Sequence, residues 1–244
     1  MNTTEKEMAS FADELGDMKA CTGKPKQMGG LPHELGSTGF GVAHSALTAM
    51  QLLNMDETKA RVAIEGFGNV GTFTARHLHE KGIKIVAISD LSGCLYNPQG
   101  LDVPRLLEYK HNNPYLSEFV KVDGAKLMPK EELFKLDADV LIPGARPDAI
   151  NDANKAAVKA KLVVEAANIP ATNAIERELE ARGIAIVPDI VANAGGVISS
   201  YVEFTGGTEA QMFSLVKKTV TDNTHTVIKR HIETKSDSRE ISLE

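Results

Sequence analysis

The chain has 244 residues, of which 25% are charged and 42% are hydrophobic, and its net charge at neutral pH is −6. This composition is ordinary for a soluble globular protein, and the acidic balance argues against nucleic acid as a partner. No apolar run approaches the roughly 18 residues of a membrane span, and the polar, acidic residues 1–16 do not resemble a signal peptide. Cys21 and Cys94 have no disulfide or metal-binding spacing, so we expect a cytoplasmic protein with no metal site and no membrane contact.

Two helices and a long loop are expected at the N-terminal end. Residues 1–21 predict an amphipathic helix, because apolar residues such as Phe11 and Leu15 recur at helical spacing. Residues 23–41 are rich in glycine and predict a loop. A second helix is expected over residues 42–53, with its apolar side chains on one side.

A glycine-rich turn between a strand and a helix is the most informative stretch. The strand is expected over residues 61–65 and the helix over residues 72–81. Between them lie Gly66, Phe67, Gly68, Asn69, Val70 and Gly71. In a dinucleotide-binding βαβ unit the first glycine permits the tight turn, the second lets backbone approach the pyrophosphate, and the third allows the helix to pack on the strand. The pyrophosphate then lies at a helix N-terminus, where unpaired N–H groups favour negative charge.

Ser89 and Asp90 end the next apolar run, and Asp90 lies 19 residues after Gly71. In such a unit a carboxylate there accepts hydrogen bonds from the adenosine ribose, which favours NAD and repels the 2′-phosphate of NADP. Residues 91–97 are also able to shield this carboxylate, and Asp90 has a second interpretation as a loop cap. We therefore expect NAD or NADP as the cofactor and leave the choice open.

The remainder of the chain alternates strands with helices. The elements expected in chain order are a loop or small hairpin over 91–100, a helix over 101–110, a strand over 138–142, a helix over 152–160, a strand over 161–166, a helix over 172–182, a strand over 184–187 and a helix over 216–232. This alternation is typical of a parallel sheet covered on both faces. We predict a doubly wound, Rossmann-like α/β fold, and we expect residues 234–244 to be frayed or incomplete.

Ligands of such sheets lie beyond the carboxyl ends of the strands. Small residues and amide side chains gather there, and those expected to contact the cofactor are Ala145, Arg146, Ala167, Asn168 and Asn193. Turn or N-cap roles are the alternative for the two asparagines. Their shared location at strand ends favours ligand contact.

Four motifs together resemble one protein family. They are Thr38-Gly39-Phe40-Gly41, the Gly66–Gly71 turn, Glu165-Ala166-Ala167-Asn168, and residues 188–197 with Ser200-Tyr201-Val202-Glu203. This set resembles the cofactor-binding domain of glutamate dehydrogenases and, less closely, the leucine, phenylalanine and valine dehydrogenases. The resemblance extends from Thr22 to about Glu203, and the asparagine-alanine-double-glycine segment is its most specific part.

The resemblance implies an NAD(P)-dependent amino acid dehydrogenase, which deaminates L-glutamate oxidatively to 2-oxoglutarate and ammonium. It implies that Thr38 and Asn193 contact the nicotinamide side, that Asn168 contacts its ribose or carboxamide, and that Val197 and Ser200 contact the substrate. In that family a separate N-terminal domain supplies the catalytic lysine and aspartate. No catalytic residue is therefore assigned to this chain, and Lys24 matches the linker motif of the family rather than its catalytic lysine.

The same resemblance divides the chain into three parts. Residues 1–22 are expected to be a helix remnant of the interdomain region, 23–205 the NAD(P)-binding domain, and 206–244 an incomplete C-terminal helical segment. We expect this fragment to bind the cofactor, to need the missing N-terminal domain for L-glutamate or 2-oxoglutarate, and to be inactive alone, while the full-length protein forms a homo-oligomer. Two alternatives stay open: a non-catalytic NAD(H)-sensing module, and the cofactor domain of a leucine- or phenylalanine-type dehydrogenase.

Overall fold

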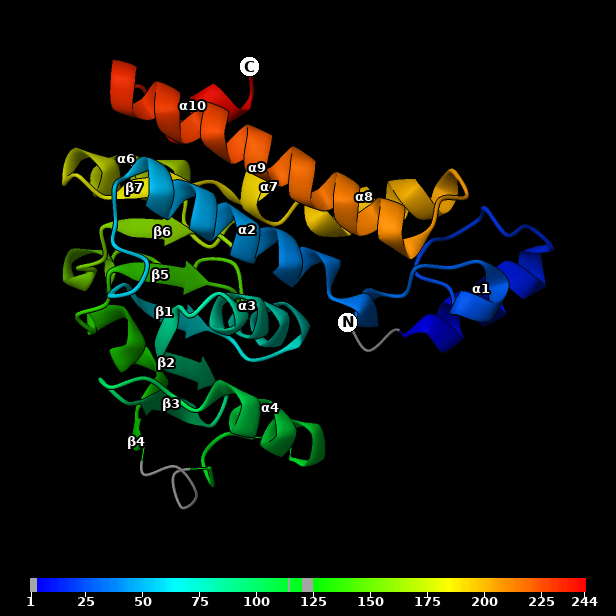
Figure 1. The fold of residues 1–244 in the computed structure, drawn as a ribbon, viewed down its shortest axis with the longest axis horizontal. Coiled ribbons are helices and arrows are strands. Elements are labelled where there is room, and N and C mark those ends of the chain that lie inside the picture. Colours follow the sequence, from blue (N-terminus) through cyan, green and yellow to red (C-terminus); the bar gives the residue numbers. More distant parts are fainter. Residues whose placement is uncertain (1–3, 114, 120–124) are drawn as a thin grey trace.

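A single sheet of seven strands organises the part of the chain that the structure, a computed structural model, describes: residues 4–113, 115–119 and 125–244 (Figure 1). The strands are β1 (Arg61–Glu65), β2 (Lys84–Asp90), β3 (Gly93–Tyr96), β4 (Lys126–Met128), β5 (Val140–Pro143), β6 (Leu162–Val164) and β7 (Ala185–Val187). Their order across the sheet is β4-β3-β2-β1-β5-β6-β7. The neighbouring strands β2, β1, β5, β6 and β7 are parallel to one another. At one edge, β3 pairs antiparallel with β2, and β4 pairs antiparallel with β3. The expected mostly parallel sheet and the hairpin after β2 are confirmed.

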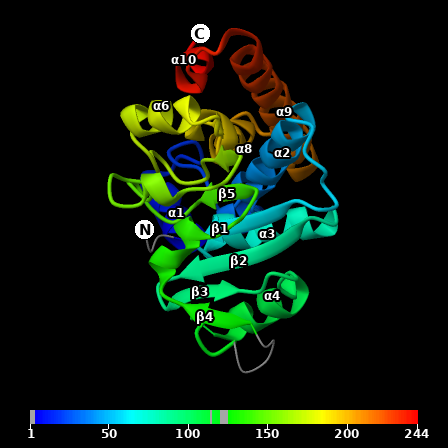
Figure 2. The ribbon, with the colours of Figure 1, turned by 90° about the vertical axis from the view of Figure 1, so that its left-hand side faces the viewer.

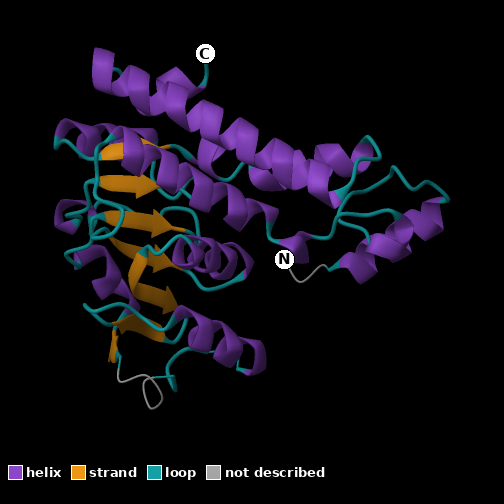
Figure 3. Ribbon diagram, viewed as in Figure 1, coloured by secondary structure: helices purple, strands orange, loops and turns teal. Residues whose placement is uncertain are grey.

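Helices cover both faces of this sheet (Figures 2 and 3). The longer ones are α1 (Glu5–Leu15), α2 (Ser37–Leu52), α3 (Asn69–Glu80), α4 (Val103–Asn112), α6 (Asn173–Ala181), α8 (Gly195–Phe204) and α9 (Glu209–Thr234). Side chains alternate between the two faces of a strand, so Val62 and Ile64 pack with α2, α3 and α9 while Ala63 packs with α6 on the other side. Because both faces are buried, the strands are nearly continuous apolar runs.

Short elements complete the described fold. They are the 3₁₀ turns η1 (Lys26–Met28), η2 (His33–Leu35), η3 (Lys130–Lys135) and η4 (Lys155–Ala157), and the helices α7 (Asp189–Ala192) and α10 (Ser238–Ser242). The helix α1 lies beyond the end of α8, away from the sheet (Figure 1). No helix in the described ranges combines the length and apolarity needed to cross a membrane.

The helix expected over residues 152–160 is absent, and only the turn η4 forms there. Two asparagines explain the difference. The side chain of Asn151 accepts from the N–H of Ala153 at 3.0 Å, and that of Asn154 accepts from the N–H of Asn151 at 2.9 Å. These local bonds compete with the helical ladder, as short polar side chains commonly do.

The loop expected over residues 23–41 ends earlier than its glycine content indicates. Gly36 adopts the left-handed conformation with φ 76°, and α2 begins directly after it at Ser37. Gly39 and Gly41 therefore lie inside a helix. A Cβ on Gly39 would lie 2.6 Å from the carbonyl oxygen of Val70, so its lack of a side chain lets α2 approach α3. Thr38 is consequently in the first turn of a helix rather than in a loop.

The C-terminal tail is not frayed, contrary to the expectation. Residues Ser238–Ser242 form α10, whose Ile241 is buried in the main core. Asp237 caps this helix by accepting from the N–H groups of Arg239 and Glu240. Polar composition alone suggested a frayed end, but Arg239 is bound inside the protein by buried carboxylates that come from distant parts of the chain.

Candidate functional site

The turn between β1 and α3 is built by close backbone contacts. Gly66 has φ +91°, which favours glycine, and its N–H donates to the carbonyl oxygen of Ser89 at 2.9 Å. A Cβ on Gly71 would lie 1.9 Å from the carbonyl oxygen of Gly66, so only glycine lets α3 rest on this turn. A Cβ on Gly68 would meet nothing within 4 Å. No side chain caps the N-terminus of α3.

A cavity of about 470 Å³ lies over this turn. The predicted cofactor residues that line it are Gly66, Phe67, Gly68, Asn69, Val70, Gly71, Ser89, Asp90, Ala145 and Arg146. The tertiary structure thus brings together the ends of β1, β2 and β5 around one space of a size that suits part of a dinucleotide.

Several wall residues of the cavity were not anticipated. They are Glu65, Lys110, Tyr115, Lys130, Glu131 and Phe134, and the wall also includes Leu91 and Gly144. Most of them come from α4, from the segment after it and from η3, which are far from the glycine turn in sequence. The sequence offered one signal for these residues, their position after the strand that ends at Asp90, and that part of the sequence contains no recognisable motif. The cavity therefore holds both acidic and basic side chains.

Asp90 serves as a loop tie at the rim of this cavity. Its Oδ1 accepts from the N–H of Ser92 at 2.7 Å and from Ser92 Oγ at 2.5 Å, and its Oδ2 accepts from the N–H of Leu116 at 2.9 Å. The interpretation of Asp90 as a loop cap is thus confirmed. Each carboxylate oxygen can accept more than one hydrogen bond, so the side chain retains acceptor capacity toward the cavity.

Glu65, the last residue of β1, links this strand to the turn that follows β5. Its side chain accepts from the N–H of Ala145 at 3.0 Å, and the Arg146 guanidinium lies 3.8 Å from its other oxygen. Burial raises the pKa of Glu65, against the opposing effect of the Ala145 hydrogen bond and the Arg146 charge. This contact holds the turn after β5 against the glycine turn.

The residues expected on the nicotinamide side form a second group that does not line the cavity. Asn193 Nδ2 donates to Asn168 Oδ1 at 2.8 Å and lies 3.4 Å from the carbonyl oxygen of Ala166. The neighbouring Ala167 donates its N–H to the carbonyl oxygen of Pro143 at 3.0 Å. These bonds join the loops that follow β5, β6 and α7.

Thr38 lies against the glycine pair that follows Asn193. A Cβ on Gly195 would be 2.3 Å from the carbonyl oxygen of Ser37, and one on Gly196 would be 2.8 Å from Thr38 Oγ1. Side chains at these two positions would therefore push α8 away from the first turn of α2. The asparagine-alanine-double-glycine segment owes its glycines to this close approach.

The two expected substrate residues lie on α8. Val197 is 75% exposed, and Ser200 Oγ accepts a hydrogen bond from Thr22 Oγ1 at 3.0 Å. Thr22 was not assigned a role from the sequence, although its position in the Thr-Gly-Lys-Pro segment was a usable signal. Its contact with Ser200 places two hydroxyl groups side by side near the middle of α8.

Lys24 is a structural residue. Its ammonium group is buried, pairs with Glu203 Oε1 and donates to the carbonyl oxygen of Cys21 at 2.6 Å. Glu203 Oε2 also accepts from the N–H groups of Gly23 at 2.8 Å and Leu31 at 2.7 Å. This cluster fastens the segment before α2 to α8, and it leaves Lys24 committed to an ion pair.

Comparisons with known proteins agree on one family. Residues 29–241 match the family model described as glutamate/leucine/phenylalanine/valine dehydrogenase. The chain is 41% identical over 220 residues to the NADP-specific glutamate dehydrogenase of Saccharolobus shibatae, covering 88% of this chain and 51% of that protein. It is 38% identical over 205 residues to an NAD-specific glutamate dehydrogenase of Staphylococcus aureus, covering 84% and 49%.

Solved structures give the same result. The hetero-hexameric glutamate dehydrogenase of Thermus thermophilus in a leucine-bound form superposes with a TM-score of 0.87 at 26% identity, covering all of this chain and 60% of that chain. The glutamate dehydrogenase of Peptoniphilus asaccharolyticus superposes with a TM-score of 0.79 at 31% identity, covering 99% and 59%. The chain spans about half the length of the curated relatives it matches. It belongs to the glutamate/leucine/phenylalanine/valine dehydrogenase family.

Proposed function

We propose that this chain is the cofactor-binding part of an NAD- or NADP-dependent glutamate dehydrogenase. The observation that carries this proposal is the open space around Gly68. Its backbone angles, φ −86° and ψ −157°, are open to other residues, and a side chain there would meet no protein atom within 4 Å. The protein itself therefore does not require glycine at position 68, whereas a diphosphate lying against the turn would require it.

Two separate groups of the described residues suit the two halves of such a cofactor. The cavity over Gly66–Gly71, with Asp90 at its rim, suits the adenosine and diphosphate, since the uncapped N-terminus of α3 favours an anion. The linked amides of Asn168 and Asn193, next to Thr38, suit the nicotinamide carboxamide and its ribose. When bound, the cofactor supplies the hydride acceptor, and these residues orient it.

Glutamate is the substrate we favour among the amino acids named for the family. The hydroxyl groups of Thr22 and Ser200 lie 3.0 Å apart near the middle of α8. Because Thr22 donates to Ser200, the hydroxyl hydrogen of Ser200 is left to donate to a side-chain carboxylate, and an aliphatic substrate would offer it no acceptor. The names of the relatives from Saccharolobus shibatae and Staphylococcus aureus support the same substrate.

The isolated chain is expected to bind the cofactor without turning over glutamate. A general base must lie within about 3 Å of the proton that it removes, inside a site closed to water. Lys24 is paired with Glu203 and is not available for this role. The resemblance assigns the catalytic lysine and aspartate to a second domain, and the relatives are about twice as long as the matched region. We propose that the two-domain protein is an oligomer, as the Thermus thermophilus enzyme is.

Calorimetric titration of the purified chain with NADH and NADPH tests this proposal. Saturable binding of one or both, with no glutamate-dependent reduction of NAD⁺ or NADP⁺, is the expected result. Absence of binding to both cofactors would contradict the cofactor assignment. Substantial reduction of either cofactor by the chain alone would contradict the assignment of catalysis to another domain.

A further inference from the structure

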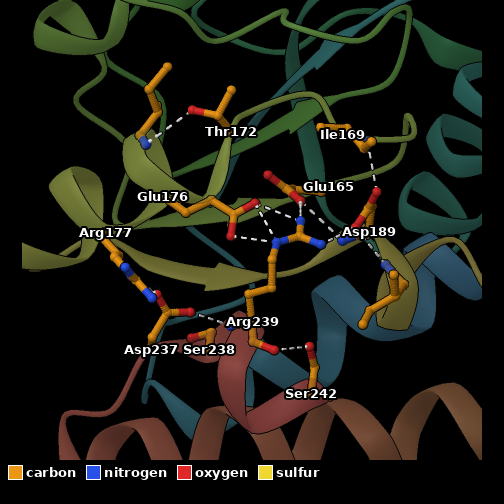
Figure 4. A network of polar contacts seen from close by, with 12 residues as sticks. Glu165, Ile169, Thr172, Glu176, Arg177, Asp189, Asp237, Ser238, Arg239 and Ser242 are labelled. Atoms are coloured by element: carbon orange, nitrogen blue, oxygen red, sulfur yellow. Dashed lines mark hydrogen bonds and ion pairs between the residues drawn. The ribbon is translucent and has the colours of Figure 1, made fainter.

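A buried ion-pair network joins the C-terminal tail to the sheet (Figure 4). The guanidinium of Arg239 in α10 contacts three acidic side chains from three other parts of the chain. Its Nη1 lies 2.9 Å from Asp189 Oδ1, its Nη2 lies 2.9 Å from Glu165 Oε2, and Glu176 accepts from Nε and Nη2 at 2.6 to 3.0 Å. All three carboxylates are buried.

Among the described residues, Arg239 is the one cation that pairs with these three carboxylates. Buried carboxylates cannot be solvated, and removing the partner of a buried ion pair leaves an uncompensated charge inside the protein. Glu165 already illustrates this cost, because burial and the nearby Glu176 raise its pKa well above its ordinary value even beside Arg239. The positions of Glu165 and Asp189 are therefore tied to Arg239.

These two carboxylates stand at the base of both asparagine loops. Glu165 directly precedes the segment that ends at Asn168, and its Oε2 accepts from the N–H of Asp189 at 3.1 Å. Asp189 begins α7, and its carbonyl oxygen accepts from the N–H of Asn193 at 2.9 Å. Arg239 thus holds one residue in each loop that carries an expected nicotinamide contact.

The backbone beside Asn168 is strained and needs support. Ile169 has φ 50°, a left-handed conformation that is costly for a β-branched residue. Its N–H donates to Asp189 Oδ2 at 2.7 Å, so one oxygen of Asp189 holds Ile169 while the other faces Arg239. The amide pair of Asn168 and Asn193 lies immediately next to this support.

We propose that Arg239 is a positioning residue for the nicotinamide half of the cofactor, an inference that rests on the proposed function. By fixing Glu165 and Asp189 it holds Asn168 and Asn193 in register. Docking of α10 is thereby coupled to affinity for the nicotinamide ring. Neither Arg239 nor its partners line the cavity over the glycine turn, so the adenosine diphosphate half binds independently of this network.

Two probes and two substitutions test the inference on the chain as it stands. The probes are NADH, or NADPH if that cofactor binds better, and ADP, carrying the 2′-phosphate where NADPH is used, which lacks both the nicotinamide and its ribose. Arg239→Met removes the cation, and Arg239→Lys is a milder variant that keeps the charge but serves fewer carboxylates at once. We expect the methionine variant to lose about tenfold in affinity for the reduced cofactor while its affinity for ADP is unchanged, and the lysine variant to fall between.

Arg177→Met is the matched control. Arg177 also fastens α10 to the body, through Asp237 and Glu240, but it is 54% exposed and does not contact Glu165 or Asp189. This variant is expected to bind both probes as the unaltered chain does. Circular dichroism and thermal unfolding establish that each variant is folded, and the fluorescence of bound NADH reports the surroundings of the nicotinamide directly.

The outcomes separate the inference from the function beneath it. If the unaltered chain binds neither probe, both the proposed function and the inference fall. If it binds ADP and the reduced cofactor equally well, or if the folded lysine variant weakens both equally or neither, cofactor binding stands and the positioning role of Arg239 is overturned.

Discussion

A Cβ atom on Gly71 would lie 1.9 Å from the carbonyl oxygen of Gly66, so the first turn of α3 rests directly on the turn that leaves β1. Gly68, three residues before Gly71, has no such contact within 4 Å. The three glycines of this turn therefore have different reasons for being glycine. Gly66 and Gly71 serve the fold, and Gly68 faces the cavity.

Alanine substitutions at Gly71 and Gly68 are expected to separate stability from binding. Gly71→Ala forces a side chain onto backbone and is expected to destabilise the chain by about 1–3 kcal/mol. Gly68→Ala is expected to change the free energy of unfolding by less than about 0.5 kcal/mol while weakening cofactor binding. Urea denaturation and calorimetric titration measure the two effects. Unchanged cofactor affinity in Gly68→Ala would contradict the placement of the diphosphate.

Replacing Glu203 tests the buried ion pair with Lys24. Glu203→Gln leaves the Lys24 ammonium buried without a charged partner and is expected to cost about 3–5 kcal/mol of stability. The exposed pair of Lys26 and Glu209 is the control, because Lys26→Met is expected to cost less than about 1 kcal/mol. Equal effects of the two substitutions on urea unfolding would show that burial does not matter at this site.

The same carboxylate gives a pH dependence. Burial works to raise the pKa of Glu203, but hydrogen bonds from Lys24, Leu31 and Gly23 outweigh it and the pKa is lowered from 4.5. The unfolded chain then takes up a proton at a higher pH than the folded chain does. The stabilisation is present above pH 4.5 and is lost as the pH falls through the folded pKa. Unfolding of Glu203→Gln is expected to lack this acid-dependent part.

His44 is expected to make the fold sensitive to mild acid. It lies in an aromatic contact with Phe40, and burial, followed by the charges of Lys217, His77 and Lys81, lowers its pKa from 6.5 to about 4. Below pH 6.5 the unfolded chain gains a proton that the folded chain binds only near pH 4, so stability falls across this window.

Substituting this histidine checks the effect. His44→Gln does not titrate, and after the exposed part of the ring is discounted, it is expected to remove about 1–2 kcal/mol of the stability lost between neutral pH and about pH 5. His79→Gln, at an exposed position on α3, is the matched control. If both variants lose stability with acid as the unaltered chain does, His44 is not the group responsible.

Asp90→Asn separates the loop contacts of that residue from its proposed role in cofactor binding. The amide can still accept from Ser92, but its NH₂ group cannot accept from the N–H of Leu116, so we expect a loss of about 1–2 kcal/mol in stability. Loss of the charge is expected to shift relative affinity from NADH toward NADPH. Ser92→Ala, which keeps the carboxylate, is the control and is expected to leave that ratio unchanged. An unchanged ratio in Asp90→Asn would exclude Asp90 from cofactor selection.

Local patterns were enough to predict the first half of the site. The strand over residues 61–65, the glycine turn, the helix after it and the hairpin beyond Asp90 are all set by apolar periodicity and turn residues close together in sequence. The opposite wall of the cavity was not predictable in this way. Its Lys110, Tyr115 and Lys130 reach the cavity because α4 packs against α3 and η3 packs against β1, β2 and β3.

The sequence by itself determined the parallel sheet, the dinucleotide-type turn and the family resemblance, because glycine spacing and strand periodicity are properties of neighbouring residues. Only the tertiary structure decided what the isolated charges do. Lys24 and Arg239 look like ordinary surface residues in the sequence, yet both are paired with carboxylates in the interior. Glu203 lies 179 positions from Lys24, and the three partners of Arg239 lie 50 to 74 positions from it. A buried charge needs a partner wherever the chain can supply one, and chain folding, not sequence proximity, chooses it.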